Sequence, residues 1–351
     1  MMLPTSLGLI LPEFAPAERH IAIGVWAATG AIAAAAGPPL GGLLVQADWR
    51  LVFLVNVPVA IVGLIAGYRI LVERREEHAL MPDLPGTAAF TVAITALVLA
   101  IVKAPNWSWL STPVIGLTVL SVVLLAWIWQ RSQHHPSPIV DPSMLRVRTF
   151  RLAVIASLLF FAGFAGMLLA GVLFLTGVWH EGVLTAGLML FPGPLMASIF
   201  SIPAARLGGR IGYRIPGVIG GLMFAAGSLW WITHTQLSPS YLTDYLPGML
   251  IGGSGVGLMI PTVTGAGASA LAPERFATGA AVLTMGRQVG AALGVAILVA
   301  VLGSGVTTLS SFHHAWLICL AGGLSAALTL ATIRPAATLH ATPALTSTPT
   351  S

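Results

Sequence analysis

The chain has 351 residues, of which 56% are hydrophobic and only 8% are charged, and its net charge is +5. A soluble domain carries about 25% charged residues, so most of this chain must lie in lipid rather than in water. The basic residues stand in short loops between apolar segments, which argues against a nucleic-acid partner. The single cysteine, Cys319, excludes an intramolecular disulfide and a cysteine metal cluster.

Apolar segments long enough to cross a bilayer recur along the chain, because a span needs about 20 residues. The predicted spans are 21–45, 51–71, 86–103, 112–130, 151–176, 183–203, 214–234, 243–268, 278–303 and 313–333. Residues 1–12 are too short to span and lack the basic region of a signal peptide, so we expect the end of a helix there. The sequence predicts an all-α polytopic membrane protein with about ten transmembrane helices.

The basic residues define an orientation. Fourteen of the 16 fall in alternate loops. They are Arg19, Arg69, Arg74, Arg75, Arg131, Arg146, Arg148, Arg151, Arg206, Arg210, Arg214, Arg275, Arg287 and Arg334. By the positive-inside rule these loops and the C-terminus are cytoplasmic. We therefore expect a multi-pass protein of the cell (plasma or inner) membrane, with lipid as its surroundings.

One segment occurs twice. PAERHIAIGVWAATG (16–30) aligns with APERFATGAAVLTMG (272–286) at an offset of 256 residues, with Gly30 on Gly286. Both copies enter a predicted helix from a cytoplasmic loop. Two parallel halves related by an axis along the membrane normal are typical of transporters.

Small residues follow both copies at helical spacing. Ala33, Gly37 and Gly41 share one helix face, as do Gly286, Gly290 and Gly294. Such faces let membrane helices approach closely, and neighbouring helices re-satisfy the carbonyls that prolines leave free. From spacing alone, plain structural packing is the simpler interpretation.

A family resemblance rests on two motifs that follow each other. The first consists of Gly37, Pro38, Gly41 and Gly42 in GPPLGG, and the second of Trp49, Arg50, Phe53, Asn56 and Pro58 in WRLVFLVNVP. Together they resemble the fifth and sixth helices of the major facilitator superfamily, and more closely its fourteen-helix drug:proton antiporter branch. The segment 273–298 is similar to the thirteenth helix of that branch, and the resemblance covers about residues 5–334.

The resemblance implies a helical bundle that lacks most of the first four helices. Residues 1–72 would be a remnant of the N-terminal half, holding the end of helix 4 with helices 5 and 6. Residues 73–150 would contain two linker helices and a cytoplasmic loop. Residues 151–334 would be a complete six-helix C-terminal half, and 335–351 a disordered tail. A partner chain is one way to supply the missing helices.

The loop 204–214 resembles the cytoplasmic gating motif of the family. Arg206, Arg210 and Arg214 fit it, but Gly209 stands where the family has an aspartate. The loss of that acid puts a gating role in doubt, and simple anchoring by positive charge is the alternative.

Acidic residues are rare in the predicted spans. Asp48, Glu181 and Asp244 stand near outer ends, and none stands near the middle of a span. In the family a proton-carrying acid commonly lies in the first helix, so we expect coupling to depend on upstream residues. Asp244 and Glu181 are weaker local candidates.

Two other charged positions leave alternatives open. At the outer turn, Arg50 next to Trp49 either pairs with Asp48 or snorkels to the interface, and Asn56 is a candidate for a hydrogen bond across helices. Arg287 either pairs with Glu274 in the loop or faces a cavity.

A substrate cavity is expected along the first helix of the second half. The candidates combine aromatic, methionine and polar side chains: Phe160, Phe164, Met167, Met196, Arg287 and Gln288. Aromatic rings and flexible methionines suit lipophilic or cationic ligands, although core packing or lipid contact is the simpler explanation of these residues.

No enzymatic or metal motif competes with this interpretation. His134–His135 and His313–His314 are adjacent pairs, which cannot both bind one metal from one helix face. We therefore expect no enzyme, cofactor or metal, but a transporter of small lipophilic or cationic compounds, proton-coupled and exporting drugs by alternating access. The alternative is a truncated, transport-inactive fragment or a membrane interaction module.

Overall fold

The computed structural model describes residues 10, 13–15, 18–70, 83–272, 275–303 and 308–333. Within these residues the regular elements are helices, and ten segments are long and apolar enough to span a membrane, as predicted. The elements are α2 (Arg19–Ala47), α3 (Leu51–Leu54), α4 (Asn56–Ile70), α5 (Leu84–Trp107), α6 (Thr112–Ser132), α7 (Pro142–Arg146), α8 (Arg148–Gly177), α9 (Val183–Leu190), α10 (Pro192–Ile211), α11 (Arg214–His234), the π-helix η2 (Tyr241–Tyr245), α12 (Leu246–Ser269), α13 (Phe276–Leu302) and α14 (Leu309–Ala331). The all-α polytopic prediction is confirmed.

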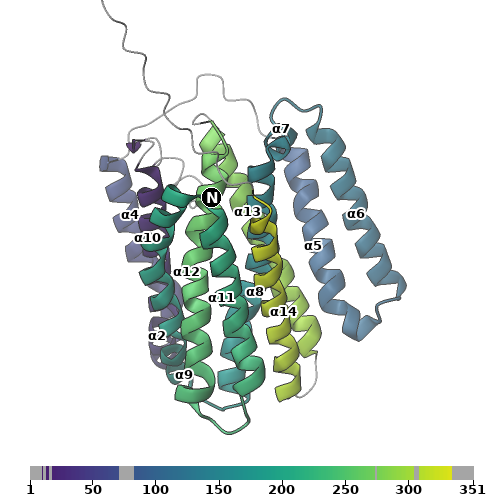
Figure 1. Cartoon of the computed structure of the whole chain (residues 1–351). Coiled ribbons are helices and arrows are strands. Elements are labelled where there is room, and N and C mark those ends of the chain that lie inside the picture. Colours follow the sequence, from purple (N-terminus) through teal and green to yellow (C-terminus); the bar gives the residue numbers. More distant parts are fainter. Residues whose placement is uncertain are drawn as a thin grey trace, which may run out of the picture.

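The spans stand side by side in one bundle (Figure 1). Helices α8 to α14 form a packed body, in which α8 contacts α13 and α14, α11 contacts α12 and α14, and α10 contacts α12. Helix α2 packs against α9 and α10 on one side, and the α5–α6 hairpin reaches the body through α13. Helix α4 lies at the edge with none of its span buried.

Two predicted spans are interrupted, each just before a proline. The span from Leu51 breaks at Val55, and Pro58 follows in the first turn of α4. Proline lacks the amide proton that would pair with the carbonyl four residues earlier. At the break the Asn56 side chain also donates to the nearby carbonyls of Val52 and Phe53, at 3.1 and 3.3 Å. The second break, between α9 and α10, comes at Phe191, immediately before Pro192.

The glycine face of α13 packs directly on α8. A Cβ atom at Gly290 would strike the Leu158 carbonyl, and one at Gly294 would strike the Ala162 carbonyl. Gly286 lies one step further along the same face. Close backbone approach of this kind is how small residues hold membrane helices together, so the predicted face of Gly286, Gly290 and Gly294 is confirmed.

The corresponding face of α2 behaves differently. A Cβ atom at Gly37 or Gly41 would meet nothing within 4 Å, and Ala33 is exposed. The packing predicted for this face is therefore not formed among the described residues. Gly42, on another side of α2, lies against the backbone of Leu184 in α9.

Aromatic side chains fill one end of the packed body. Trp231 and Tyr245 stack with ring centroids 5.2 Å apart, and the Trp231 indole donates to the Tyr245 carbonyl at 2.9 Å. Phe174, Phe312 and Trp316 pack around them, all fully buried. This cluster lies where α8 and α11 end and α12 and α14 begin, opposite the end that carries most of the arginines.

Candidate functional site

The two copies of the sequence repeat meet in space. Ile23 of α2 packs against Phe276 and Ala280 of α13, and the Arg19 guanidinium lies 5.1 Å from the centre of the Phe276 ring. Helix α2 begins at Arg19 and α13 at Phe276, within one residue of the predicted offset. The contact lies at the basic end of the bundle, meaning the end where α2, α8, α11 and α13 begin.

A small cavity follows this contact along the helices. Its volume is about 20 Å³, which holds a group of about the size of one water molecule. Four helices contribute to its wall. The wall includes Trp26 of α2, Ser157 and Phe161 of α8, Thr264 of α12, and Thr284 and Arg287 of α13. The cavity therefore lies between α2 and the packed body.

Arg287 is the deepest basic residue of the described spans. It lies eleven residues after Phe276 and fifteen before Leu302, about 16 Å from the nearer helix end. Its guanidinium lies 4.5 Å from the centre of the Phe161 ring, and no carboxylate of a described residue is within ion-pair distance. Of the two predicted arrangements, the structure has Arg287 in the cavity; Glu274 lies outside the described residues.

The other cavity candidates lie elsewhere. Phe160 is fully buried against Phe224 of α11, with ring centroids 5.1 Å apart, and Phe164 stacks on Phe160. Met167 belongs to the same core. Neither Met196 nor Gln288 lines the described cavity. The residues of α8 that line the cavity are Ser157 and Phe161, one turn apart.

Helical spacing from the predicted residue Arg287 identifies the wall residues of α13 that were missed. Ala280, Leu283, Thr284 and Arg287 share one face of α13 and all line the cavity. Ser157, one turn before Phe161, would have extended this pattern onto α8.

The predicted gating loop shows no acidic partner in the described part of the chain. Arg206, Arg210 and Arg214 are exposed at the end of α10 and the start of α11. A Cβ atom at Gly209 would come within 2.7 Å of the His20 ring of α2. The His20 imidazole of α2 therefore lies against Gly209, the position at which the resemblance implies an aspartate.

The predicted outer turn is held by local contacts. The Arg50 guanidinium lies 3.6 Å from the Asp48 carboxylate and 4.8 Å from the centre of the Trp49 ring. Both charged side chains are well exposed, so the pair contributes little to stability. The Asn56 amide donates within its own span, and among the described residues it makes no bond to another helix.

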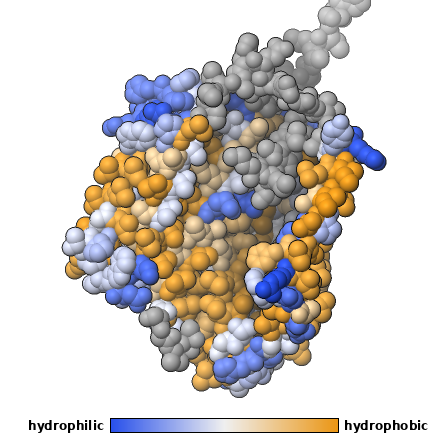
Figure 2. Space-filling view, turned by 180° about the vertical axis from the view of Figure 1, so that it is seen from behind, coloured by the Kyte–Doolittle hydropathy of each residue, from blue (hydrophilic) through white to orange (hydrophobic). Residues whose placement is uncertain are grey.

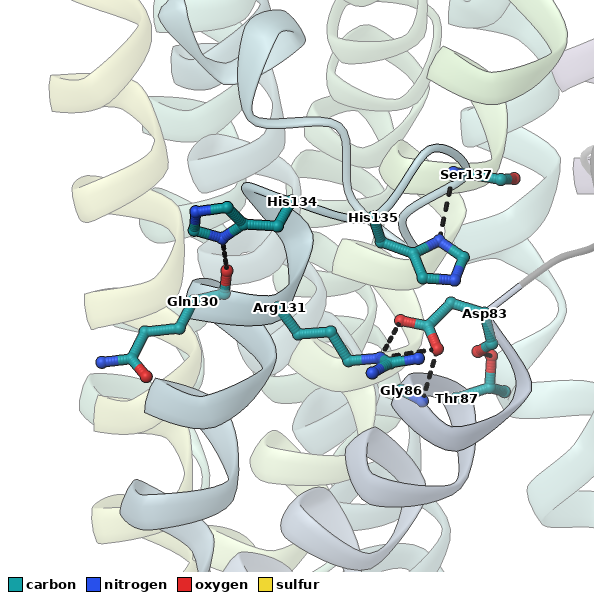
Figure 3. Close-up of polar contacts among 8 residues, drawn as sticks. All are labelled: Asp83, Gly86, Thr87, Gln130, Arg131, His134, His135 and Ser137. Atoms are coloured by element: carbon teal, nitrogen blue, oxygen red, sulfur yellow. Dashed lines mark hydrogen bonds and ion pairs between the residues drawn. The ribbon is translucent and has the colours of Figure 1, made fainter.

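Sequence reasoning missed a buried ion pair between the linker helices (Figure 3). Arg131 of α6 donates from Nε to both carboxylate oxygens of Asp83, at 2.9 Å each. Asp83 also caps α5 by accepting from the Gly86 amide at 2.9 Å, and its side chain is only 2% exposed. The sequence DLPG (83–86), an acid followed by a proline in the first helical turn, is the signal that identifies this cap.

Hydrogen bonds and charge set the ionisation of Asp83. Burial by itself raises the pKa of the carboxyl, but the Gly86 amide and the Arg131 guanidinium outweigh it and hold the pKa below its ordinary value of 3.8. The nearby His135 lowers it further. Asp83 is thus ionised at neutral pH and ties the start of α5 to the end of α6.

Acidic residues are nearly missing from the described spans. Asp244, in η2, is the one example, and the Thr243 hydroxyl donates to its carboxylate at 2.7 Å. The described residues form no group of histidine, cysteine or acidic side chains that could hold a metal ion.

Comparisons with known proteins agree with this architecture. The model of the Major Facilitator Superfamily matches residues 1–295. The multidrug resistance protein Stp of Mycobacterium tuberculosis (strain H37Rv) is 33% identical over 303 residues, which is 85% of this chain and 55% of that protein. The tetracenomycin C resistance and export protein of Streptomyces glaucescens is 30% identical over 85% of this chain and 55% of its own length.

A third relative extends the same picture. The drug efflux pump JefA of M. tuberculosis (strain CDC 1551 / Oshkosh) is 28% identical over 84% of this chain and 58% of its own length. The chain spans about half the length of the curated relatives it matches. The chain belongs to the Major Facilitator Superfamily.

Proposed function

We propose that the chain functions in the export of small lipophilic compounds across the cell membrane by alternating access. The observation that carries this proposal is the cavity between α2 and the helices α8, α12 and α13, where Arg287 and three hydroxyl side chains interrupt a mostly apolar wall. Transporters of this type bind their substrates between repeated halves near the middle of the bilayer. The names of the relatives, which refer to drug resistance and export, support the same function.

The proposal includes a division of the chain into two unequal halves joined by a linker. Residues 151–334 act as a complete six-helix half, residues 1–72 as part of the other half, and residues 73–150 as a linker with two helices, as in the fourteen-helix branch. The contacts of α2 with α9 and α10 lie at the boundary between these parts. The basic end is cytoplasmic and holds the C-terminus, in keeping with its arginines.

Proton antiport is the proposed driving reaction. This proposal rests on the resemblance to drug:proton antiporters. The described spans themselves contain one acidic residue, Asp244, and therefore add little support for a proton site. We therefore propose that the proton is carried outside the mid-span region described, by further segments or by a partner chain.

Drug accumulation in cells tests the export proposal. Cells without their own exporters would express the chain, and retention of neutral, acidic and basic lipophilic dyes would be compared. We expect lower retention of at least one dye than in cells expressing Gly294→Trp, which would force α13 away from α8. Equal retention of every dye at equal membrane abundance would contradict export and favour a transport-inactive membrane module.

A further inference from the structure

We propose that the cavity recognises lipophilic compounds that carry a negatively charged oxygen group, such as a carboxylate or a phenolate, in preference to cations. This inference rests on the proposed function, because it assigns a substrate class to the same cavity. It differs from the lipophilic or cationic class that the sequence predicts.

The first argument is the charge of Arg287. A charged side chain deep in a span is costly and marks a functional position by default. Phe161 covers one face of the guanidinium, but no described carboxylate neutralises it. An arginine offers five N–H donors and no acceptor. The side chain therefore attracts anionic oxygen and repels a cationic ligand.

The second argument is independent of charge. Ser157 is fully buried, and its hydroxyl has no hydrogen-bond partner in the described part of the chain. It lines the same cavity, from α8, that Arg287 enters from α13. Buried hydroxyls are almost always hydrogen-bonded, so an unpartnered one on a cavity wall points to a ligand. The Ser157 hydroxyl can donate to the oxygen that Arg287 attracts.

The wall offers a cation no oppositely charged side chain. The residues that line the cavity include no carboxylate. The Thr264 hydroxyl donates its proton to the Ile260 carbonyl at 2.9 Å, so it offers a ligand only neutral oxygen lone pairs. The remaining wall consists largely of rings and aliphatic side chains, such as Trp26, Val263 and Leu283.

The size of the cavity determines which part of the ligand can enter it. About 20 Å³ holds an oxygen-sized group but not an aromatic ring. The headgroup would therefore enter between Arg287 and Ser157, while the apolar body rests against the apolar walls outside. Seen from behind, the molecule has a hollow between the α5–α6 hairpin and the α2–α4 side, with an apolar floor interrupted by a hydrophilic patch (Figure 2).

Three probes that share one ring system test the proposal. They are 1-naphthoate, 1-naphthamide and 1-naphthylmethylammonium, which differ in the charge of the headgroup. Their binding to the purified full chain in phosphatidylcholine nanodiscs would be measured by equilibrium dialysis at pH 7. We expect naphthoate to bind at least about tenfold more tightly than the ammonium probe, because charge-assisted bonds favour the former and like charge disfavours the latter.

Variants assign the preference to the cavity. Arg287→Gln should weaken naphthoate binding about tenfold and leave naphthamide within about twofold, whereas Arg287→Lys should retain most of the preference. Ser157→Ala should weaken naphthoate about threefold or more. Arg146→Gln, which removes an exposed charge on α7, is the matched control and should change nothing.

Two results would overturn the proposal: ammonium binding equal to or tighter than naphthoate binding in the unmodified chain, or an unchanged preference in Arg287→Gln. If Arg287→Gln fails to fold, the probe preference of the unmodified chain and the naphthoate affinity of Ser157→Ala still test the proposal. A naphthoate preference without any export from cells would contradict only the proposed function. Export of dyes without a naphthoate preference would contradict only this inference.

Discussion

The Asp83–Arg131 pair shows how one buried acid can organise two helices. Its carboxylate accepts from the Gly86 amide at the start of α5 and from the guanidinium near the end of α6. Hydrogen bonds to a charged group each contribute about 1.5–3 kcal/mol. The pair lies within the hairpin and holds α5 to α6, whereas the hairpin reaches the packed body mainly through α13.

Substitution of this acid should loosen the hairpin. Asp83→Asn keeps the shape of the helix cap but leaves Arg131 without its charge partner, so we expect a loss of about 1–3 kcal/mol in stability. Thermal unfolding of the purified chain in detergent measures it. Asp141→Asn is the matched control, since Asp141 also caps a helix but pairs with Arg275 at 3.5 Å in an exposed position. A loss for Asp83→Asn no larger than that of the control would contradict this role.

The depressed pKa of Asp83 gives a pH dependence with a definite sign. A carboxyl whose pKa is lower in the folded chain stabilises fully above its unfolded value and loses that contribution as pH falls through the folded pKa. We expect a constant difference in melting temperature between the unmodified chain and Asp83→Asn from pH 7 to 5. The difference should shrink below pH 3.8. A difference that disappears already between pH 7 and 5 would refute the assignment.

Single residues differ in how far the sequence predicts their place. Arg287 could be predicted as a cavity residue because a charge within an apolar span is costly and is retained where it serves a function. Phe160 and Phe161 could not be distinguished, because both are apolar and one residue apart on the same helix. The role of Asp83 escaped prediction because this acid stands outside the spans, where acids are ordinary.

At the scale of elements, the two glycine faces show that the same residue spacing can be packed in one helix and open in another. Both show the same spacing, yet the face of α13 meets α8 and the face of α2 is open in the described structure. Spacing predicts that a helix can approach another closely, but not which partner it meets. Span positions were predictable from hydropathy, whereas the breaks at Val55 and Phe191 depend on prolines whose effect varies with their surroundings.

The α8–α13 contact provides a test with a natural control. Gly290→Ala should destabilise the chain by about 1–3 kcal/mol, because the added methyl group meets the Leu158 carbonyl. Gly37→Ala adds the same methyl group on α2, where nothing lies within 4 Å, and should be neutral. The melting temperatures of Gly290→Ala and Gly37→Ala would be compared in detergent. Equal values would show that the α13 face is not tightly packed.

For the whole molecule, the sequence repeat places the starts of α2 and α13 together, and both helices line the same cavity. Helices α2 and α13 begin at equivalent positions, meet at Phe276, and then diverge around the cavity. Composition and the repeat were sufficient to predict a transporter-like bundle. They could not predict the cavity wall, because that wall depends on how four helices rotate about their axes.

The most direct test is chemical access to the cavity wall. Cys319 is buried, so a second cysteine can report on its own surroundings. Thr284→Cys places a thiol on the cavity wall, and Val299→Cys places one on an exposed, apolar position of the same helix. A water-soluble, membrane-impermeant maleimide would be applied to the chain in nanodiscs, with and without 1-naphthoate. If the cavity is a water-connected ligand site, Thr284→Cys reacts faster than Val299→Cys and naphthoate slows only the former; equal rates that naphthoate leaves unchanged would contradict it.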